Sequence, residues 1–415
     1  MITTLRNAWK IPELRKKLLF TLLILLIFRV GSTIPVPYIN GTVLSQYYSQ
    51  NLANTVLGLL NAMSGSSLST AKLFALSIQP YINASIIIEL LTIAIPALER
   101  MAKEEGEEGK QKINRITRYT TVGISFLMGW AYYVMLSNYG GILTETGFLP
   151  GVVIVLSFAA GAAFVMWLGE QITEFGVGNG ISIILFANII SRVPSLIGTA
   201  ISALQTKTIT WWILVLLVIG ILALIAFIVF ITNAERRIPV QYAKRVVGRK
   251  IYGGQSSHLP IIFAQSIASV PATICTFVGK TSGWWYTNVF DSSCVVYAVI
   301  YFILIIAFSY FYATVQYNPV EIANNMKMNG GFIPGFRPGR PTSEFIAKTI
   351  HKIVLFGALY LGVVALLPII VGNAIGVPSL AVGGTSVIIV VGVATETVEQ
   401  IEAQMLMRHY KGFLE

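Results

Sequence analysis

The chain has 415 residues, of which 55% are hydrophobic and 11% charged, with a mean hydropathy of +0.73 and a net charge of +11. It has too few charged side chains to cover a soluble globule of this size, and too much apolar surface to remain disordered. The composition excludes both classes and indicates a protein whose main solvent is lipid. Cys275 and Cys294 have no metal-binding or redox spacing and are interpreted as buried apolar residues.

The chain begins with a basic arm. Residues 1–17 are basic and amphipathic, and an apolar run follows directly from Leu18. No short apolar core with a cleavage site occurs there, so we expect no segment to be removed as a signal peptide.

Ten apolar runs approach the roughly 20 residues that cross a bilayer. The fifth and seventh are short or interrupted by polar residues. We expect ten membrane spans, at about 18–35, 73–98, 118–137, 150–169, 178–195, 211–232, 259–279, 295–316, 353–371 and 379–402.

The basic residues alternate between the two sides of these spans. Both termini and the segments 99–118, 233–258 and 317–352 hold 24 of the 29 lysines and arginines, and the alternate loops hold 3. Short cytoplasmic loops collect lysine and arginine, so this asymmetry predicts cytoplasmic termini. A nucleic-acid-binding protein has no reason to separate its charge in this way.

Ten spans with both ends inside divide into two sets of five, and an odd number per half forces the halves into opposite orientations. We expect an N-terminal half at residues 1–195, an outer connection at 196–210 and a C-terminal half at 211–415. Inverted halves place the working site at their interface, near the membrane midplane.

Ionisable residues are scarce within the spans. This favours a passive pore over the main alternative, an inverted-repeat secondary transporter, which needs charged groups at its binding site. His258, His351 and His409 share no ligand spacing, so we expect no metal site. No HExxH, GxSxG or dinucleotide-binding spacing occurs, and we expect neither an enzyme nor a cofactor.

Several spans contain helix-breaking residues. Pro80 interrupts the second span, "GVGNGIS" opens the fifth, and Pro271 interrupts the seventh. Non-helical backbone at membrane depth is tolerated where it lines a cavity, and an ordinary kinked helix is the alternative at each place. In the outer loop, the apolar run 56–63 is too short to span. It predicts either a half-helix that folds back into the protein or a helix lying on the outer leaflet.

Six segments of the chain resemble, in order and spacing, the SecY family, whose members are the central subunits of the bacterial Sec preprotein translocase. The likeness covers nearly the whole chain. The segments are "FALSIQPYINASIIIELL", "GVGNGISII", "ERRIPVQYAKR", "GGQSSHLP", "YNPVEIANNMKMNGGFIPGFRPGRPT" and "GGTSVIIVV".

The resemblance implies an all-α polytopic membrane protein with ten transmembrane helices in two inverted five-helix halves around an hourglass pore. A re-entrant plug, an apolar pore ring and a lateral gate to lipid complete this architecture. The implied activity is a protein-conducting channel of the bacterial plasma membrane that catalyses no reaction. It passes unfolded secretory proteins across the membrane and releases membrane-protein helices sideways.

The family's functional residues map onto this chain position by position. The pore ring is Ile78, Ile82, Ile181, Leu185, Ile262 and Ile389, with Leu185 in place of an expected isoleucine. The plug, at about 56–70, contains Val56, Leu57, Gly58, Leu59, Leu60, Asn61, Met63, Ser64 and Gly65. The lateral gate contains the polar residues Gln79, Asn83, Gln265 and Ser266. The docking residues on the loops 233–258 and 317–352 are Arg236, Arg237, Lys244, Arg245, Arg337 and Arg340.

The partners implied are the small subunits SecE and SecG, the SecA motor ATPase, the ribosome, signal sequences, unfolded preproteins and membrane lipid. Arg337 is the strongest single docking candidate, because positive-inside charge explains its sign but not its "GFRPG" context. The chain departs from the family after Pro260, where about ten residues of the gate helix are missing. We therefore expect a short seventh helix.

Overall fold

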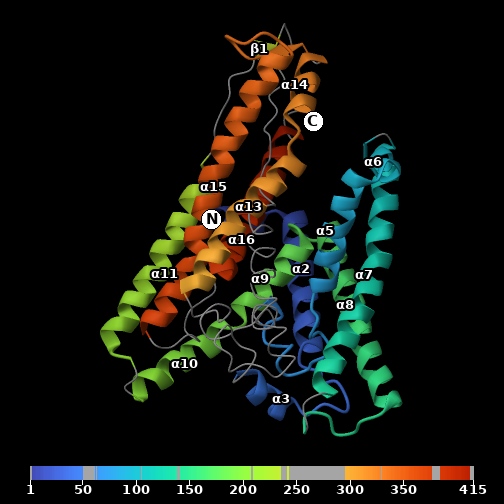
Figure 1. Ribbon diagram of the computed structural model, residues 1–415, viewed down its shortest axis with the longest axis vertical. Helices are drawn as coiled ribbons and strands as arrows, with labels where there is room; N and C mark the ends of the chain where they lie inside the picture. The colour runs from blue at the N-terminus through green and yellow to red at the C-terminus, as the bar shows by residue number, and fades with distance from the viewer. Residues whose placement is uncertain are drawn as a thin grey trace. The chain divides into compact units, whose positions relative to one another are not determined.

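The computed structural model of the chain is dominated by α-helices (Figure 1). Among the residues that it describes, strands occur only as the pair β1 (Gln241–Tyr242) and β2 (Gly331–Phe332), which is antiparallel. The structure describes residues 2–49, 61, 63–103, 105–137, 141–206, 209–234, 241–242, 295–328, 330–375 and 384–411.

The chain divides into two compact units. The first holds residues 1–198 and 389–415, and the second holds residues 199–388. The helices of the first unit are α1 (Ile2–Lys10), α2 (Pro12–Gly31), α3 (Gly41–Tyr47), α5 (Gln79–Ala94), α6 (Pro96–Lys103), α7 (Gly106–Ser137), α8 (Phe148–Phe175) and α9 (Gly180–Ile190). Those of the second are α11 (Trp211–Thr232), α13 (Val295–Gln316), α14 (Pro319–Met328) and α15 (Arg340–Ile375). The boundary between the units falls within α10 (Val193–Gln205) and again within α16 (Gly384–Lys411).

Six helical segments of the described residues are long and apolar enough to cross a membrane, and a bent pair formed by α5 and α6 makes a seventh. The six are 106–137, 148–175, 180–205, 211–232, 296–328 and 340–367. Nine of the ten expected spans overlap helices in the described part of the chain. The remaining expected span, the seventh in chain order at 259–279, lies outside the described residues.

Pro80 begins a helix, so the alternative of a kinked helix is wrong at this position. Residues 64–77 before it form turns, Ile78 is the N-cap of α5, and the proline stands in the first turn. A proline is tolerated there because the first amides of a helix have no partner within the helix. The helix ends at Ala94, and a bend of 104° separates it from α6.

Asn179 begins the short helix α9. Its side-chain oxygen accepts hydrogen bonds from the backbone N–H groups of Ile181 and Ser182, at 3.1 and 3.4 Å. This satisfies two amides that the helix itself leaves unpaired. The expected break at "GVGNGIS" is therefore a loop with a capped helix start.

Two glycines allow the non-helical segment before α5 to pack closely against the neighbouring helices. A Cβ atom built on Gly161 of α8 would lie 2.1 Å from the carbonyl oxygen of Leu73, and one built on Gly31 of α2 would lie 2.1 Å from the Phe74 ring. The Phe74 ring also stacks on Phe28 of α2, with 5.6 Å between ring centroids, and on Phe164 of α8 at 5.9 Å. Stacked rings of this kind contribute about 0.5–1.5 kcal/mol per pair beyond their burial. These contacts join α2 and α8 to the segment before α5.

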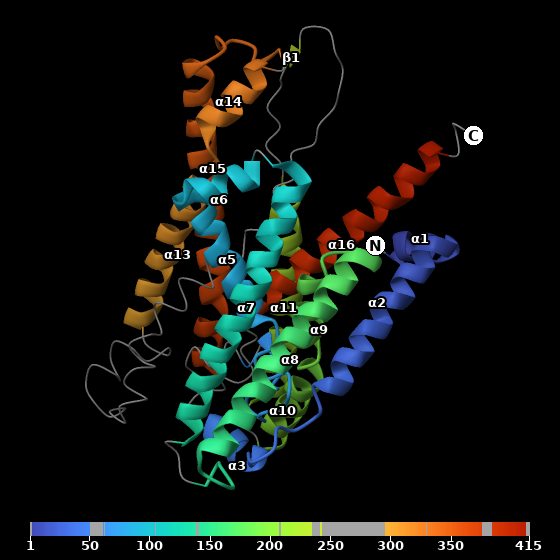
Figure 2. The ribbon, with the colours of Figure 1, turned by 90° about the vertical axis from the view of Figure 1, so that its right-hand side faces the viewer.

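The second unit is built around α13 and α15, which pack along each other (Figure 2). A Cβ atom on Gly362 of α15 would lie 2.3 Å from the Phe302 ring of α13, so the helices approach closely here. Phe227 of α11 meets Tyr360 of α15 edge to face, at 5.6 Å between ring centroids. The outer surface of α11 keeps large apolar side chains exposed, among them Leu216 and Phe230. Such a surface suits contact with lipid.

We expect Gly161→Ala to destabilise the protein. Alanine favours a helix by about 1 kcal/mol over glycine, but the added methyl group must displace the Leu73 carbonyl, and overpacking costs about 1–3 kcal/mol. The thermal unfolding midpoint of the detergent-solubilised protein should fall. Gly123→Ala on α7 is the matched control, since a Cβ atom there meets no atom within 4 Å. An equal or higher midpoint for Gly161→Ala than for Gly123→Ala would contradict the packing described here.

Candidate functional site

The turns before α5 form a buried loop, which we call the turn segment (residues 63–70). The side-chain oxygen of Asn61 accepts a hydrogen bond from the backbone N–H of Ser69 at 2.9 Å, and the Tyr132 hydroxyl of α7 donates to the carbonyl oxygen of Leu68 at 2.6 Å. Met63 and Leu68 are buried. These residues therefore pack within the protein, whereas the run 56–63, to which the two alternatives applied, is described only at Asn61 and Met63. Of the expected plug, residues 56–60 lie outside the described residues.

Tyr48 packs in the apolar core that surrounds the turn segment. Its side chain is buried in an apolar cluster that includes Leu68 and Tyr132. Burial, more than the nearby Tyr132, raises the pKa of the Tyr48 phenol, because the charged form loses its hydration. The phenol therefore stays protonated at physiological pH.

Two of the expected pore-ring residues lie against Gly169 of α8. A Cβ atom built on Gly169 would lie 3.3 Å from a side-chain carbon of Ile181 and 3.4 Å from one of Ile78. One built on Gly180, at the start of α9, would lie 1.9 Å from the Gly169 carbonyl oxygen. The close approach of α8 and α9 at two glycines therefore brings these isoleucines together.

The other ring candidates differ in exposure. Leu185 and Ile389 are buried, and Ile82 is partly exposed on α5. Ile78 itself is fully buried at 0% exposure, so it packs against protein. Ile262 lies outside the described residues.

The gate residue Gln79 has a different environment from the one expected. As a polar residue of a cavity wall it should be solvated, but it is only 5% exposed and its side-chain N–H donates to the Met63 sulfur at 3.1 Å. Asn83, one turn further along α5, donates to the Met128 sulfur of α7 at 3.8 Å. Thioether sulfur is a weak acceptor, and each contact pairs one N–H of the side-chain amide. Gln265 and Ser266 lie outside the described residues.

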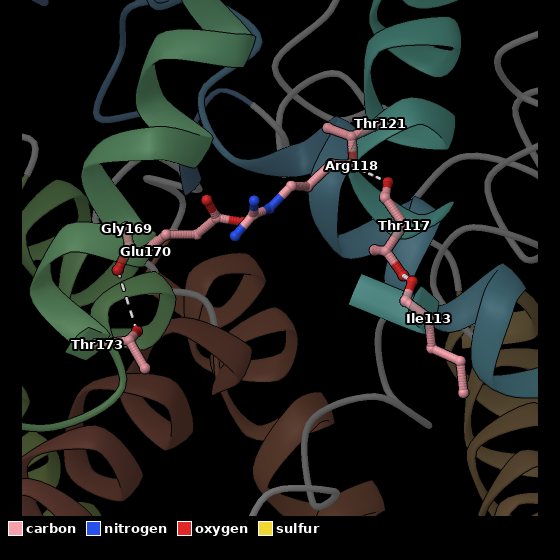
Figure 3. A network of polar contacts seen from close by, with 7 residues as sticks. All are labelled: Ile113, Thr117, Arg118, Thr121, Gly169, Glu170 and Thr173. Carbon is pink, nitrogen blue, oxygen red and sulfur yellow. Dashed lines mark hydrogen bonds and ion pairs between the residues drawn. The ribbon is translucent and has the colours of Figure 1, made fainter. Parts of the chain in front are cut away.

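An ion pair joins α7 to α8 near the ring candidates (Figure 3). Arg118 donates from Nε to a carboxylate oxygen of Glu170 at 2.7 Å, and Glu170 directly follows Gly169. Arg118 is 54% exposed and Glu170 is 23% exposed. Solvent screens such a pair, and its contribution to stability is about 0–1 kcal/mol. Its geometric effect is to fix the spacing of α7 and α8 beside Gly169.

The C-terminal end of α9 carries two further polar contacts. The guanidinium of Arg29 on α2 donates to the carbonyl oxygen of Ala187. A cation at the C-terminal end of a helix also interacts favourably with the helix dipole. Asn188 is fully buried and donates to the Ser77 hydroxyl at 3.0 Å. The end of α9 is thus tied both to α2 and to the residue just before α5.

The candidate docking residue Arg337 lies in a turn of the α14–α15 hairpin (residues 319–350). The hairpin has its own apolar core, formed by Ala323, Ile333 and Ile346. Strand β2 pairs with β1, so the preceding loop is attached to the hairpin at residues 241–242. The apolar core and the strand pairing together hold the exposed turn that carries Arg337. Arg236, Arg237, Lys244 and Arg245 lie outside the described residues.

The side chain of Arg337 is exposed, and contacts of the neighbouring residues fix its backbone. The buried Thr342 hydroxyl donates to the Arg337 carbonyl oxygen at 2.9 Å, and the rings of Phe336 and Phe345 lie 4.4 Å apart. Gly339 has a φ of +110°, a conformation that only glycine adopts readily. Arg340 is exposed too, but it pairs with Glu344 at 3.1 Å. Of the two described docking candidates, Arg337 is therefore the more available to a partner.

A groove of about 350 Å³ lies beside this turn, between α14 and the start of α15. It is lined by Val320, Ala323, Asn324, Gly339, Arg340, Ser343 and Glu344.

The sequence analysis missed the ion pair and the buried amide. Arg118 was counted only as a loop charge, and Glu170 was not considered. A carboxylate within the apolar run "MWLGEQI" and an asparagine within "ILFANII" were the available signals, because a polar group inside a membrane helix needs a partner. Neither signal identifies the partner.

Comparison with known proteins gives consistent results. A sequence model of the SecY family matches residues 72–398. The protein translocase subunit SecY of Streptomyces scabiei is 42% identical to this chain over 439 residues, and that of Bacillus subtilis is 41% identical over 435 residues; both comparisons cover all of both chains.

Solved structures show the same fold. One described as "The structure of a protein conducting channel" superposes with a TM-score of 0.64 at 18% identity, covering 96% of each chain. One described as "Sec61 in the Canine ribosome-channel complex from the endoplasmic reticulum" gives 0.63 at 17% identity, again over 96% of each chain. The expected fold class, an all-α polytopic membrane protein of this channel type, is confirmed.

We expect Thr342→Val to loosen the turn that carries Arg337. Valine keeps the volume of threonine but cannot donate a hydrogen bond, and a hydrogen bond of this kind contributes about 1 kcal/mol. Amide hydrogen exchange at Phe336 and Ser343 should accelerate by about fivefold. Thr342→Ser, which keeps the hydroxyl, should exchange at the rate of the unmodified protein. Equal exchange in the valine and serine variants would show that the hydrogen bond does not hold the turn.

Proposed function

This chain belongs to the SecY family, and we propose that it forms a protein-conducting channel. In this proposal unfolded secretory proteins pass through it across the bacterial plasma membrane, and helices of membrane proteins leave it sideways into lipid. One observation supports the proposal: the turn segment is buried next to Ile78, which lies with Ile181 against Gly169 of α8. Met63 of this loop accepts a hydrogen bond from Gln79, the residue next to Ile78.

The turn segment is then the inner end of a plug that closes the channel. The ring that it seals contains Ile78, Ile82, Ile181, Leu185, Ile262 and Ile389. A ring of apolar side chains suits this task because it closes around a passing chain of any sequence without binding it specifically. When it is narrow it also impedes ions, since water leaves an apolar constriction.

The halves of the channel are residues 1–195 and 211–415, connected on the outer side by residues 196–210. An inverted arrangement places the pore between them. The lateral gate lies between the second and third spans on one side and the seventh and eighth on the other, with Gln79, Asn83, Gln265 and Ser266 along it. A signal sequence is itself apolar, so its transfer from the pore to lipid through this gate is favourable.

The energy for transport comes from a partner, the SecA ATPase or the translating ribosome, because the chain has no nucleotide-binding motif of its own. Arg337 and the other basic residues of the loops 233–258 and 317–352 form the docking surface, with both chain termini on the same cytoplasmic side. Arginine suits contact with carboxylates and with RNA phosphates through planar paired hydrogen bonds. SecE and SecG complete the complex.

The channel proposal predicts contact between Ile82 and a passing chain. We expect a photo-crosslinker at Ile82 to react with a stalled secretory preprotein during active translocation in membrane vesicles. A crosslinker at Leu216, on the exposed surface of α11, is the control and should not react. If an active complex gave no crosslink from Ile82, the pore assignment would be wrong. A secondary transporter would give no preprotein crosslink from either position.

The docking proposal predicts that Arg337→Glu weakens binding of the partner. Reversing one charge in a hydrogen-bonded contact costs about 1.5–3 kcal/mol, so the Kd of the channel for SecA, or for non-translating ribosomes, should rise by tenfold or more. Lys348→Glu makes the same charge change at an exposed position on α15 and should have a much smaller effect. Similar effects from both variants would indicate general charge attraction and contradict a specific role for Arg337.

A further inference from the structure

The turn segment rests directly on the end of α9. A Cβ atom built on Gly65 would lie 2.9 Å from the Ser191 hydroxyl oxygen and 3.1 Å from the side-chain oxygen of Asn188. The backbone of Gly65 has a φ of +64°, which glycine adopts without strain. Two independent requirements, space and backbone conformation, therefore favour glycine at this contact.

Asn188 touches both sides of the same junction. Its amide N–H donates to the Ser77 hydroxyl at 3.0 Å, and Ser77 stands two residues before α5. Its side-chain oxygen faces Gly65 and accepts no hydrogen bond from any described residue, although the side chain is fully buried. A buried acceptor without a partner is uncommon, and it favours any rearrangement that supplies a donor.

The backbone between these contacts is strained. Ser66, Ala71 and Ser77 have φ values of 68°, 46° and 49°, in the left-handed region that residues with a side chain rarely adopt. Such conformations persist where the surroundings hold them, and they are released when those contacts are lost. The hydrogen bond from Asn188 is one of the contacts that hold Ser77 in this conformation.

The end of α9 is in turn anchored. Arg29 donates to the carbonyl oxygen of Ala187, the residue before Asn188, so α2 holds this end of the helix in place. Asn188 therefore contacts two other segments from the anchored end of α9. One is the turn segment and the other is the start of α5.

We propose that Asn188 is a latch that holds the turn segment in its closed position and couples its release to the start of α5. In the closed state Gly65 packs against Asn188, and the Ser77 hydroxyl accepts a hydrogen bond from Asn188. When the turn segment leaves, the unpaired oxygen gains access to water, and the strained backbone at Ser77 relaxes. Displacement of the plug and movement of the gate helix then occur together. This proposal rests on the channel function proposed above.

The first test measures ion conductance of the purified channel complex in planar bilayers without preprotein. Gly65→Ala adds a methyl group against Asn188 and Ser191 at a positive φ, and it should raise the resting conductance about fivefold or more, since 1 kcal/mol against the closed state is a factor of about five. Gly141→Ala is the matched control, with a φ of +86° and no atom within 4 Å of its Cβ position. It should leave the conductance unchanged. Equal conductance in the two variants would overturn the latch.

The second test asks whether Asn188 and Ser77 act as one unit. Asn188→Leu and Ser77→Ala each remove the bond between them, and each should raise the resting conductance. The double variant should conduct no more than the stronger single variant, because the same interaction is lost only once. Additive effects, or no effect of Asn188→Leu, would contradict the coupling.

Ile82→Asn separates failure of the latch from failure of the channel proposal. It places a polar group in the proposed ring and should raise the resting conductance whether or not the latch exists. Ile86→Val, one turn further along α5, should not. If Ile82→Asn conducts more while the Gly65 and Asn188 variants do not, the latch is wrong and the channel stands. If none of these variants changes the conductance, the channel assignment of the ring fails as well.

Discussion

The structure of the first unit depends on one constraint, which is that the non-helical backbone before α5 has to find its hydrogen bonds inside the protein. Lipid offers no partners for backbone groups, and an unsatisfied group there costs several kcal/mol. The backbone N–H of Leu73 donates to the Ile34 carbonyl at 2.8 Å, and that of Val36 donates to the Ala71 carbonyl at 3.1 Å. Residues 34–36, which follow α2, are therefore bonded to residues 71–73, which follow the turn segment.

This constraint explains features that look unrelated in the sequence. Gly161 leaves room for the Leu73 carbonyl against α8, and Gly31 leaves room for the Phe74 ring against α2. Tyr132 faces inward because its hydroxyl supplies a donor for the Leu68 carbonyl. The side chain of Asn61 serves the turn segment in the same way. A loop held by so many separate partners is a defined part of the molecule.

Local features of the candidate site were predictable from the sequence. The pairs Ile78/Ile82 and Ile181/Leu185 have helical spacing, and Asn179 is the cap that starts α9. The short apolar run 56–63 left a re-entrant half-helix and a helix on the outer leaflet both open, and only the family resemblance favoured re-entry. The environment of Gln79 did not follow, because its partner, the Met63 sulfur, belongs to the turn segment and not to α5. A polar residue in a membrane helix signals that a partner exists, but the identity of that partner depends on how the chain folds back.

The sequence by itself determined the membrane environment, most of the spans, the segregation of charge and the helix starts. These depend on composition, on periodicity and on contacts within about one helical turn, which the order of residues encodes directly. Only the tertiary structure decided the pairs Asn188 with Ser77 and Arg118 with Glu170, which are 111 and 52 residues apart. The physical reason is that such pairs form where packing of whole helices brings two side chains within hydrogen-bonding distance. The separation of two residues in the sequence does not determine the distance between their side chains.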